Sequence, residues 1–324
     1  MAGKAYADEE KAKNTIHLKG LLEQLPPFCY TYFRGISQTT SVKTRMGYAY
    51  DLKVFFGFLC AEHKDFKGVK FEDIRPEDLE MVNSEDIEEF LDYVSIYSPY
   101  NDEDGICGKE TILNSESAKA RKLAAVRSMY KYYLRKGYIS TDPAALVDTP
   151  KIHDKNIIRL EANEVANLLD EVETGENLTE RQQKFHEKTK IRDLAIITTL
   201  VGTGIRVSEC VGLNIDDINF DNFSFVITRK GGKEAEIYFG DEVAEALSDY
   251  LVYRKAHPPV DENDKSLFLS NRGKRISVRQ VELMVKKYAQ TAVKTKKITP
   301  HKLRSTFGTN LYLETGDIYL VADV

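Results

Sequence analysis

The stretch Ile298-Thr-Pro-His-Lys-Leu-Arg-Ser-Thr-Phe-Gly-Thr-Asn310 combines a helix start with two groups that bind anions. Pro300 suits the first position of a helix, so His301 and Arg304 lie three residues apart on one face of its first turns. The start of a helix is positively polarised, and an imidazole and a guanidinium placed there make a binding site for a phosphate group. The stretch therefore predicts a phosphate-binding helix.

A second arginine stands far upstream, in Gly202-Thr-Gly-Ile-Arg206-Val-Ser-Glu209. Arg206 and Arg304, together with His301, could converge on one phosphodiester. Glu209 follows Arg206 by about one helical turn. This spacing favours a carboxylate that orients the guanidinium over one that acts as a base.

Composition limits the class of protein. The chain has 324 residues, of which 42% are hydrophobic, and two domains are expected at this length. Its formal charge is -5 and its pI is about 5.8, which excludes a basic nucleic-acid binder overall but allows a local basic surface. No signal-peptide pattern follows Met1, and the most apolar stretch, 194–205, is too short to span a bilayer. We therefore expect a cytoplasmic protein without a membrane partner.

No group of residues has the spacing of a metal site or of a nucleotide loop. The four cysteines form no C-x-x-C pair, and Asp217 is interpreted as a capping or buffering acid. The segment Lys230-Gly-Gly-Lys233 lacks the spaced glycine and the Lys-Ser/Thr ending of a phosphate loop. We expect neither a metal nor another cofactor.

Periodicity and turn residues divide the chain into two mostly helical halves. A loop is expected over 98–116, and strands over 223–227 and 236–239 indicate a hairpin. Two prolines within 141–154 indicate a linker. Helices are predicted at 41–59, 83–97, 117–136, 161–171, 188–200, 241–255, 277–293 and 301–315. The expected divisions are an N-terminal arm (1–20), a first domain (21–147), a linker (148–156) and a second domain (157–324).

Basic residues gather locally in this acidic protein. Between 117 and 140 there are seven lysines and arginines and no acid. Two basic helices could grip a duplex through its phosphates, although a solvated helix face is the ordinary alternative for a charge run. The residues predicted to contact DNA are Lys43, Arg45, Lys119, Arg121, Lys122 and Arg127 in the first domain and Lys233, Arg272, Lys274, Arg275 and Arg279 in the second.

Lys230 stands at the tip of the predicted hairpin. A lysine on a flexible hairpin can give a proton to a departing alkoxide, which leaves poorly at neutral pH. For this segment taken alone, an ordinary solvated β-turn is the alternative.

Together these segments resemble the tyrosine recombinase (integrase) family, and within it the Xer-type and simple two-domain phage integrases. The matches follow the family's order, from 44–55 with 118–143, through the arginine box at 203–218 and the lysine hairpin at 227–234, to the second box at 299–307. The resemblance implies a mainly α, two-domain, C-shaped DNA clamp. In it a SAM-like helical core-binding domain precedes a tyrosine recombinase catalytic domain with a small antiparallel sheet.

The resemblance also implies how the reaction proceeds. Arg206 and Arg304 would hold the non-bridging oxygens of the scissile phosphate. His301 would hydrogen-bond that phosphate, and Lys230 would protonate the leaving 5′ oxygen. A tyrosine would attack phosphorus and form a 3′-phosphotyrosyl ester, which keeps the bond's free energy, so neither ATP nor a metal is required.

The implied partner is double-stranded DNA that carries an inverted-repeat recombination site. In the full-length protein the protomers would associate into a tetrameric synapse. Glu209 and Asp217 would lie behind the residues that touch the phosphate.

Two positions depart from the family pattern. Ser305 stands where such proteins often have a second histidine. The family places its nucleophile later than Tyr312 and Tyr319, so we expect it beyond Val324, and Tyr319 is not expected to be the nucleophile. On this interpretation the chain is a C-terminal truncation that binds DNA without cleaving it.

Two other functions stay open at the level of sequence. A type IB topoisomerase uses the same arginine, lysine and histidine chemistry but relaxes DNA as a monomer. A non-catalytic DNA-binding regulator would keep the recombinase fold without the reaction. The target DNA, and the choice between chromosome-dimer resolution, phage integration and transposon mobility, do not follow from these residues.

Overall fold

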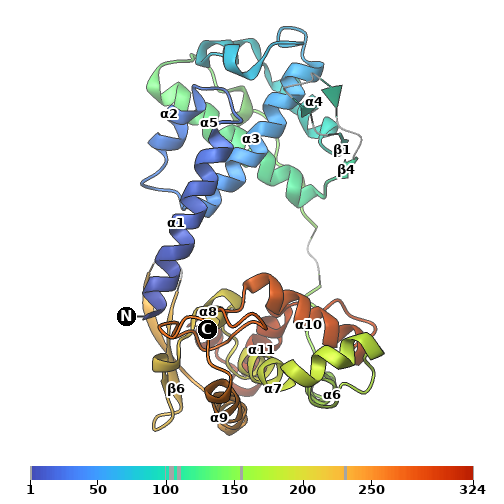
Figure 1. Cartoon of the computed structure of the whole chain (residues 1–324). Coiled ribbons are helices and arrows are strands. Elements are labelled where there is room, and N and C mark those ends of the chain that lie inside the picture. The colour runs from blue at the N-terminus through green and yellow to red at the C-terminus, as the bar shows by residue number, and fades with distance from the viewer. Residues whose placement is uncertain are drawn as a thin grey trace. The chain divides into compact units, whose positions relative to one another are not determined.

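The computed structural model describes residues 2–98, 100–101, 106–107, 111–153, 156–229 and 232–323 (Figure 1). Its backbone contacts divide the chain into two compact units, which are described separately. The helical unit comprises Glu9–Asp154, and the C-terminal unit comprises Lys155–Val324 with Met1–Asp8. Mainly helical structure with small antiparallel sheets confirms the fold class predicted from the sequence.

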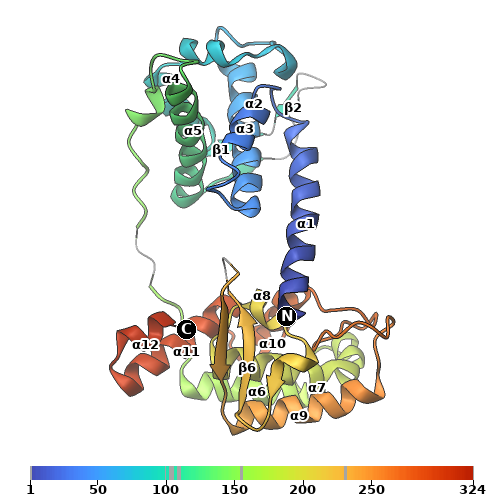
Figure 2. The ribbon, with the colours of Figure 1, turned by 90° about the vertical axis from the view of Figure 1, so that its left-hand side faces the viewer.

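The helical unit is built around α3 and α5, which lie side by side (Figures 1 and 2). Its helices are α1 (Ala2–Leu22), of which the part from Glu9 belongs here, α2 (Cys29–Gly35), α3 (Val42–Glu62), α4 (Ser84–Tyr93) and α5 (Glu116–Lys136). Large aromatic rings fill its core, and each ring that is buried removes a large apolar area from water. The fully buried rings are Tyr32, Phe33, Phe55, Phe56, Phe90, Tyr130 and Tyr133.

Capping residues set the ends of the two central helices. The Ser41 hydroxyl accepts a hydrogen bond from the Thr44 amide at 3.1 Å, which satisfies one of the free donors at the start of α3. Gly137 ends α5 in the left-handed conformation, with φ of 75°, which glycine adopts without a steric penalty. Both helices were predicted with these boundaries to within three residues.

The segment after α4 differs from its prediction. The helix predicted at 83–97 ends at Tyr93, and two short antiparallel pairs follow it. One strand lies within the predicted helix and three lie within the predicted loop. Strand β1 (Ile96–Tyr97) pairs with β4 (Ile112–Leu113), and β2 (Tyr100–Asn101) pairs with β3 (Ile106–Cys107). Such two-residue ladders depend on contacts between chain segments, and no period of two is visible over so short a run.

The C-terminal unit is organised around α7, which packs against α6, α9 and α11. Its helices are α6 (Ala162–Thr174), α7 (Glu180–Thr203), α8 (Val207–Gly212), α9 (Asp241–Ala256), α10 (Val278–Ala292), α11 (Pro300–Thr315) and α12 (Ile318–Asp323). The apolar stretch of α7 is fully buried at Ala195, Ile196, Ile197 and Leu200. This stretch therefore lies in the hydrophobic core of the unit. No helix in the described ranges is long and apolar enough to cross a membrane.

A three-stranded antiparallel sheet stands beside α8 (Figure 2). Its strands, β5 (Ile218–Asn219), β6 (Ser224–Thr228) and β7 (Glu234–Tyr238), lie in chain order. Phe225 and Ile227 of β6 are buried, while Val226 between them is exposed, so one face of the sheet covers the core. The hairpin was predicted, whereas β5 and the short α12 were not.

The start of α7 was predicted wrongly. The helix begins at Glu180 and not at 188, because Thr179 and Gln182 form a capping box in which each side chain accepts from the other residue's amide. The polar first turns of this helix hid the start from a search for apolar periodicity. Its far end is set by Gly204, which is left-handed with φ of 64°.

Candidate active site

The turn at Gly204 places Arg206 at the start of α8. Arg206 is the N-cap residue of that helix, and its amide donates to Glu209 Oε2 at 2.7 Å. The Arg206 Nη1 donates to the other carboxylate oxygen, Oε1, at 2.9 Å. The Glu209 side chain is 4% exposed and that of Arg206 is 49% exposed, so a buried acid orients a guanidinium whose outer side meets solvent.

Arg304 reaches the same turn from α11. Pro300 occupies the first turn of that helix, and Arg304 Nη1 donates to the Gly204 carbonyl at 2.5 Å. Burial lowers the pKa of Arg304, and the nearby charges of Arg206 and Arg229 lower it further, while Glu209 acts in the opposite direction. An arginine remains charged at neutral pH even so. Two guanidiniums from segments far apart in the sequence thus meet around one turn.

His301 lies one turn before Arg304 in α11 and is exposed. Its carbonyl accepts from the Ser305 hydroxyl at 3.0 Å, so Ser305 is tied to the helix backbone. Lys230 lies outside the described residues. Lys233, on the far side of the hairpin turn, is exposed, and its carbonyl accepts from the Arg229 amide at 2.7 Å.

Sequence reasoning missed Arg229, whose charge acts on Arg304. The alternation of buried and exposed side chains along the preceding strand could have indicated it. Phe225 and Ile227 are its buried residues, and residue 229 shares their face. A cation that continues an apolar face toward two other arginines is a candidate for the same site.

Asp217 is not brought to the arginines by any described contact. Its carboxylate accepts from the Asn214 amide at 2.8 Å and from the Asn214 side chain at 3.1 Å. It thereby caps the 3₁₀ helix Ile215–Asp217. A role behind the phosphate-binding residues stays a prediction for Asp217.

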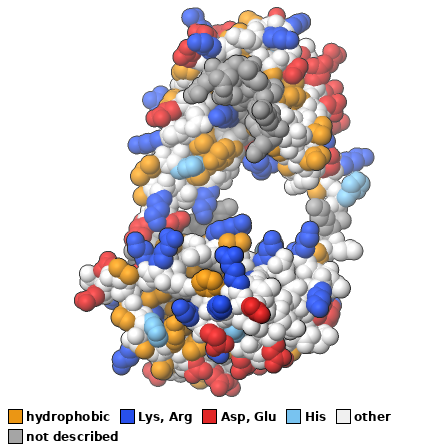
Figure 3. Space-filling model, turned by 45° about the vertical axis from the view of Figure 1, so that its right-hand side comes forward, with side chains coloured by type: hydrophobic (Ala, Val, Ile, Leu, Met, Phe, Trp, Pro, Cys, Tyr) orange, Lys and Arg blue, Asp and Glu red, His pale blue; other side chains and the backbone are white. Residues whose placement is uncertain are grey.

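The basic residues predicted to contact DNA in the C-terminal unit fall into two groups. Arg272, Lys274 and Arg279 are exposed, and Arg279 makes an exposed ion pair with Glu282 at 3.2 Å. Arg275 instead donates to the carbonyls of Val211 at 2.7 Å and Leu213 at 2.9 Å and to the Asn214 side chain at 2.6 Å. Figure 3 shows Lys and Arg side chains gathered along the upper edge of this unit, with Asp and Glu side chains along its lower edge.

In the helical unit, Lys43 and Arg121 are exposed, and Arg45 is partly buried. Lys119 makes an ion pair with Glu116 at 2.8 Å, and its Nζ donates a hydrogen bond to the Ser95 hydroxyl at 3.3 Å.

Two further basic residues of this unit are committed to its interior. Arg127 donates to the Ala144 carbonyl at 3.0 Å, to the Thr149 hydroxyl at 2.8 Å and to the Val147 carbonyl, which holds the turn after α5. The Lys122 side chain is 6% exposed and lies 3.8 Å from Asp51. The polar atoms of Lys122 and Arg127 thus have partners within the unit. Their contacts with DNA stay predictions.

Asp51 is a buried acid beneath this basic surface, and its titration gives a testable pH dependence. Burial raises its pKa to about 6, although Arg121 and Lys122 act to lower it, whereas an unfolded aspartate titrates near ~3.9. Because the folded chain holds the proton more tightly, the free energy of unfolding should fall by roughly 2 to 3 kcal/mol as the pH rises from ~4 through ~6.

The measurement is urea unfolding between about pH 4 and pH 7, on the wild type and on Asp51→Asn, which lacks this titration. The difference between the two curves isolates Asp51 from other titrating groups. A difference that grows in favour of the wild type as pH rises would contradict the expectation.

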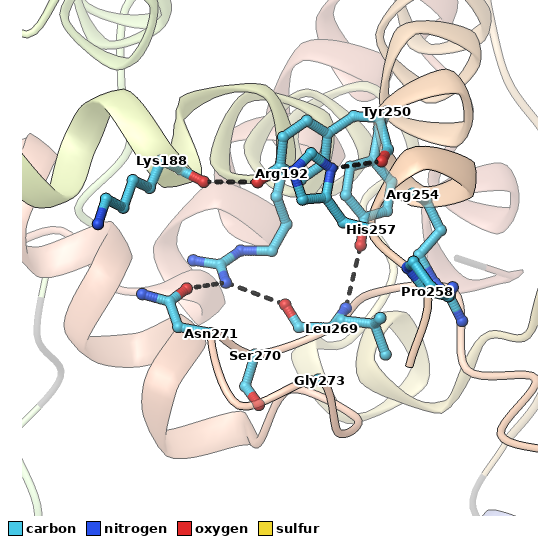
Figure 4. Close-up of a pocket in the computed structure, with 11 residues that line it drawn as sticks. Lys188, Arg192, Tyr250, Arg254, His257, Pro258, Leu269, Ser270, Asn271 and Gly273 are labelled. Atoms are coloured by element: carbon cyan, nitrogen blue, oxygen red, sulfur yellow. Dashed lines mark hydrogen bonds between the residues drawn. The ribbon is translucent and has the colours of Figure 1, made fainter. Parts of the chain in front are cut away.

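A cavity of about 190 Å³ lies in the C-terminal unit, between α7, α9 and the loop after residue 268 (Figure 4). Its arginines are already engaged. Arg192 binds Asp193, the Leu269 carbonyl and the Asn271 side chain, and Arg254 donates to the carbonyls of Asp264 and Ser266. None of its lining residues was predicted as a site residue. Among the described residues there is also no group of His, Cys, Asp and Glu that could hold a metal ion.

Comparison with known proteins identifies the family. Residues 158–324 match the model of the phage integrase family. The tyrosine recombinase XerC of Caldanaerobacter subterraneus subsp. tengcongensis is 35% identical over 286 residues, which cover 87% of this chain and 73% of that protein. The tyrosine recombinase XerS of Streptococcus uberis is 30% identical over 322 residues, which cover 92% of this chain and 87% of that protein.

Solved structures share the fold. The XerH recombinase bound to palindromic difH substrate, in a post-cleavage complex, matches with a TM-score of 0.65 at 18% identity, over 96% of this chain and 80% of that one. A λ integrase (75–356) dimer bound to a COC′ core site matches with a TM-score of 0.62 at 16% identity, over 91% of each chain. Two arginine boxes meet at one turn, the family model matches residues 158–324, and the XerC and XerS relatives match most of the chain. The chain therefore belongs to the phage integrase family of tyrosine recombinases.

Proposed function

We propose that this recombinase cleaves and rejoins double-stranded DNA at an inverted-repeat site through a 3′-phosphotyrosyl ester. The observation that carries the proposal is the meeting of Arg206 and Arg304 at the Gly204 turn. Two guanidiniums can each donate a pair of parallel hydrogen bonds to phosphate oxygens. Held in this geometry before the reaction, they stabilise the negative charge that grows on the phosphate in the transition state.

The other site residues take roles that fit their positions. Glu209, buried and bound to Arg206, positions that guanidinium and does not touch the DNA. His301 is exposed at the N-terminal turn of α11, where it can hydrogen-bond a phosphate placed on the positive end of the helix. Lys230, at the hairpin turn, protonates the leaving 5′ oxygen. Ser305, bonded to the His301 carbonyl, takes no part.

We propose that the helical unit is the core-binding domain and that both units grip the duplex. The side chains best placed for phosphate contacts are the exposed ones, namely Lys43, Arg121, Lys233, Arg272, Lys274 and Arg279. A related solved structure is that of a λ integrase tetramer bound to a Holliday junction. By analogy, we propose that the protein acts as a tetramer on paired sites, in the cytoplasm.

The attacking tyrosine stays part of the proposal. Tyr319 is 80% exposed on α12, and Tyr312 is 46% exposed on α11. We propose that neither is the nucleophile, because the resemblance places that tyrosine later in the chain. A peptide that carries a covalently attached nucleotide, identified by mass spectrometry, would name the tyrosine directly.

Selection from a random pool of DNA duplexes tests the proposal. The purified chain should enrich an inverted repeat, because two copies bound to one site are related by symmetry. Nicked duplexes of the enriched sequence then trap the covalent ester. Enrichment of no sequence, together with relaxation of supercoiled plasmid, would favour a type IB topoisomerase instead. Enrichment without any covalent ester in any form of the protein would favour a DNA-binding regulator.

A further inference from the structure

Arg229 extends the inner face of the β6–β7 hairpin. Side chains alternate between the two faces of a strand, and Phe225 and Ile227 of β6 are buried in the core of the C-terminal unit. Arg229 follows Ile227 by two residues, and its amide donates to the Lys233 carbonyl at 2.7 Å, which continues the ladder one pair beyond its last registered residues. The Arg229 side chain therefore leaves the strand on the core side, toward the body of the unit.

The Arg229 side chain has a donor that this protein leaves unused. Its Nε is shielded from solvent and has no hydrogen-bond partner among the described residues. A buried donor without a partner destabilises the folded state, because it has lost its bonds to water and gained none. A bound anion beside this guanidinium would offset that cost.

Positive charge is in excess among the described groups that act on Arg304. The charge of Arg229 acts on Arg304, which lies at the Gly204 turn with Arg206. Glu209 is the acid that acts on Arg304 in the opposite direction, and both of its oxygens already accept hydrogen bonds from Arg206. Three guanidiniums against one committed carboxylate make a site whose empty state is repulsive.

We propose that Arg229 is a phosphate-binding residue that joins Arg206 and Arg304 in holding one phosphodiester. The inference rests on the proposed function, because it places the anion at the same pair of arginines. Three guanidiniums offer the phosphate oxygens more hydrogen-bond donors than two guanidiniums can. Since Arg229 is the last paired residue before the hairpin turn, the same contact fixes the base of that turn against the bound phosphate.

Binding of inorganic phosphate tests this role without knowledge of the DNA target. The thermal midpoint of the purified chain is followed as phosphate replaces chloride at constant ionic strength, which gives an apparent dissociation constant for phosphate. Arg229→Met should weaken that constant by about tenfold or more, the effect of losing one charge-assisted contact. In chloride alone the same variant should unfold at the wild-type midpoint or above it, because an unpartnered donor and a like charge are removed. Lys255→Met, an exposed change on α9, is the control and should leave both readouts unchanged.

Three outcomes would overturn the inference or its basis. An unchanged phosphate response in Arg229→Met excludes the contact, and a lower midpoint in chloride shows a structural role instead. Arg206→Met separates the levels of the argument. If it removes the phosphate response while Arg229→Met does not, the proposed site stands and the role of Arg229 fails. If neither variant changes the response, or the wild type has none, the proposed phosphate site itself fails.

Discussion

Replacing Arg304 with alanine should lower the rate of covalent DNA cleavage by about 10²- to 10³-fold, the cost of removing a donor that stabilises transition-state charge. Arg304 donates to the Gly204 carbonyl at 2.5 Å and is partly buried, so its guanidinium is fixed before DNA arrives. Duplex binding should weaken by less than about tenfold, because one phosphate contact is a small share of the contacts that hold the duplex. The rate is measured as ester formation on the selected site, in the protein form whose attacking tyrosine has been mapped.

Arg304→Lys tests geometry apart from charge. Lysine keeps the positive charge but loses the planar fork that matches two phosphate oxygens, so most of the rate loss should remain. Lys255→Ala, exposed on α9, is the matched control and should cleave at the wild-type rate. If Arg304→Ala cleaves within tenfold of the wild type, the arginine pair at the Gly204 turn is not the catalytic site. Urea unfolding of each variant shows whether the loss of the Gly204 contact has unfolded the unit.

The parts of the site that were predicted from sequence are those that depend on neighbours in the chain. Arg206 and Glu209 lie three residues apart, and their hydrogen bond follows from helix spacing. His301 and Arg304 likewise share a helix whose start is marked by Pro300. What spacing could not give is the contact between Arg304 and Gly204, which joins segments a hundred residues apart; the resemblance to a known family supplied the expectation that the two boxes meet.

The basic residues show what residue type alone does not reveal, namely the contacts that a cation makes inside its own unit. Lys122, Arg127 and Arg275 read as cations available for DNA, yet each is bonded to acceptors within its own unit. The spacing of apolar residues along the chain shows which face of a helix or strand is buried. No such spacing shows whether a cation is bound internally, because that depends on whether the tertiary fold brings it to carbonyls or acids. Arg229 was not among the predicted site residues, because its proposed role depends on its closeness to two arginines that are distant in sequence.

Asp193 is a further contact centre that no motif indicates. It is 1% exposed, and its carboxylate accepts from the Tyr288 hydroxyl and the Thr189 hydroxyl, each at 2.9 Å, and from Arg192 Nη2 at 2.7 Å. Lys287 lies 3.6 Å from the same oxygen that the two hydroxyls contact. One aspartate thus joins α7 to α10 and satisfies four polar side chains in the core of the C-terminal unit.

Asp193→Ala should therefore destabilise the C-terminal unit by about 3 to 5 kcal/mol, the usual cost of removing one partner from a buried charge network. The loss leaves a largely buried arginine and lysine without their counter-charge. It also removes the carboxylate that accepts from the two buried hydroxyls of Thr189 and Tyr288. The pKa of Lys287 is already lowered by burial, against which Asp193 acts to raise it. Without Asp193 the pKa of Lys287 should fall further. The free energy of unfolding is measured in urea at pH 7, with the transition of the C-terminal unit followed by its own probe in case the two units unfold separately.

Asp216→Ala is the matched control, because Asp216 also pairs with a lysine, Lys265 at 2.5 Å, but both side chains are more than half exposed. Exposed pairs contribute about 0 to 1 kcal/mol, so this variant should unfold almost as the wild type does. Tyr288→Phe tests whether the network acts as a unit. Combined with Asp193→Ala, it should cost less than the sum of the two single changes, since the hydroxyl has already lost its bond to Asp193. Equal losses for Asp193→Ala and Asp216→Ala, or strict additivity with Tyr288→Phe, would show that the buried carboxylate does not hold α7 and α10 together.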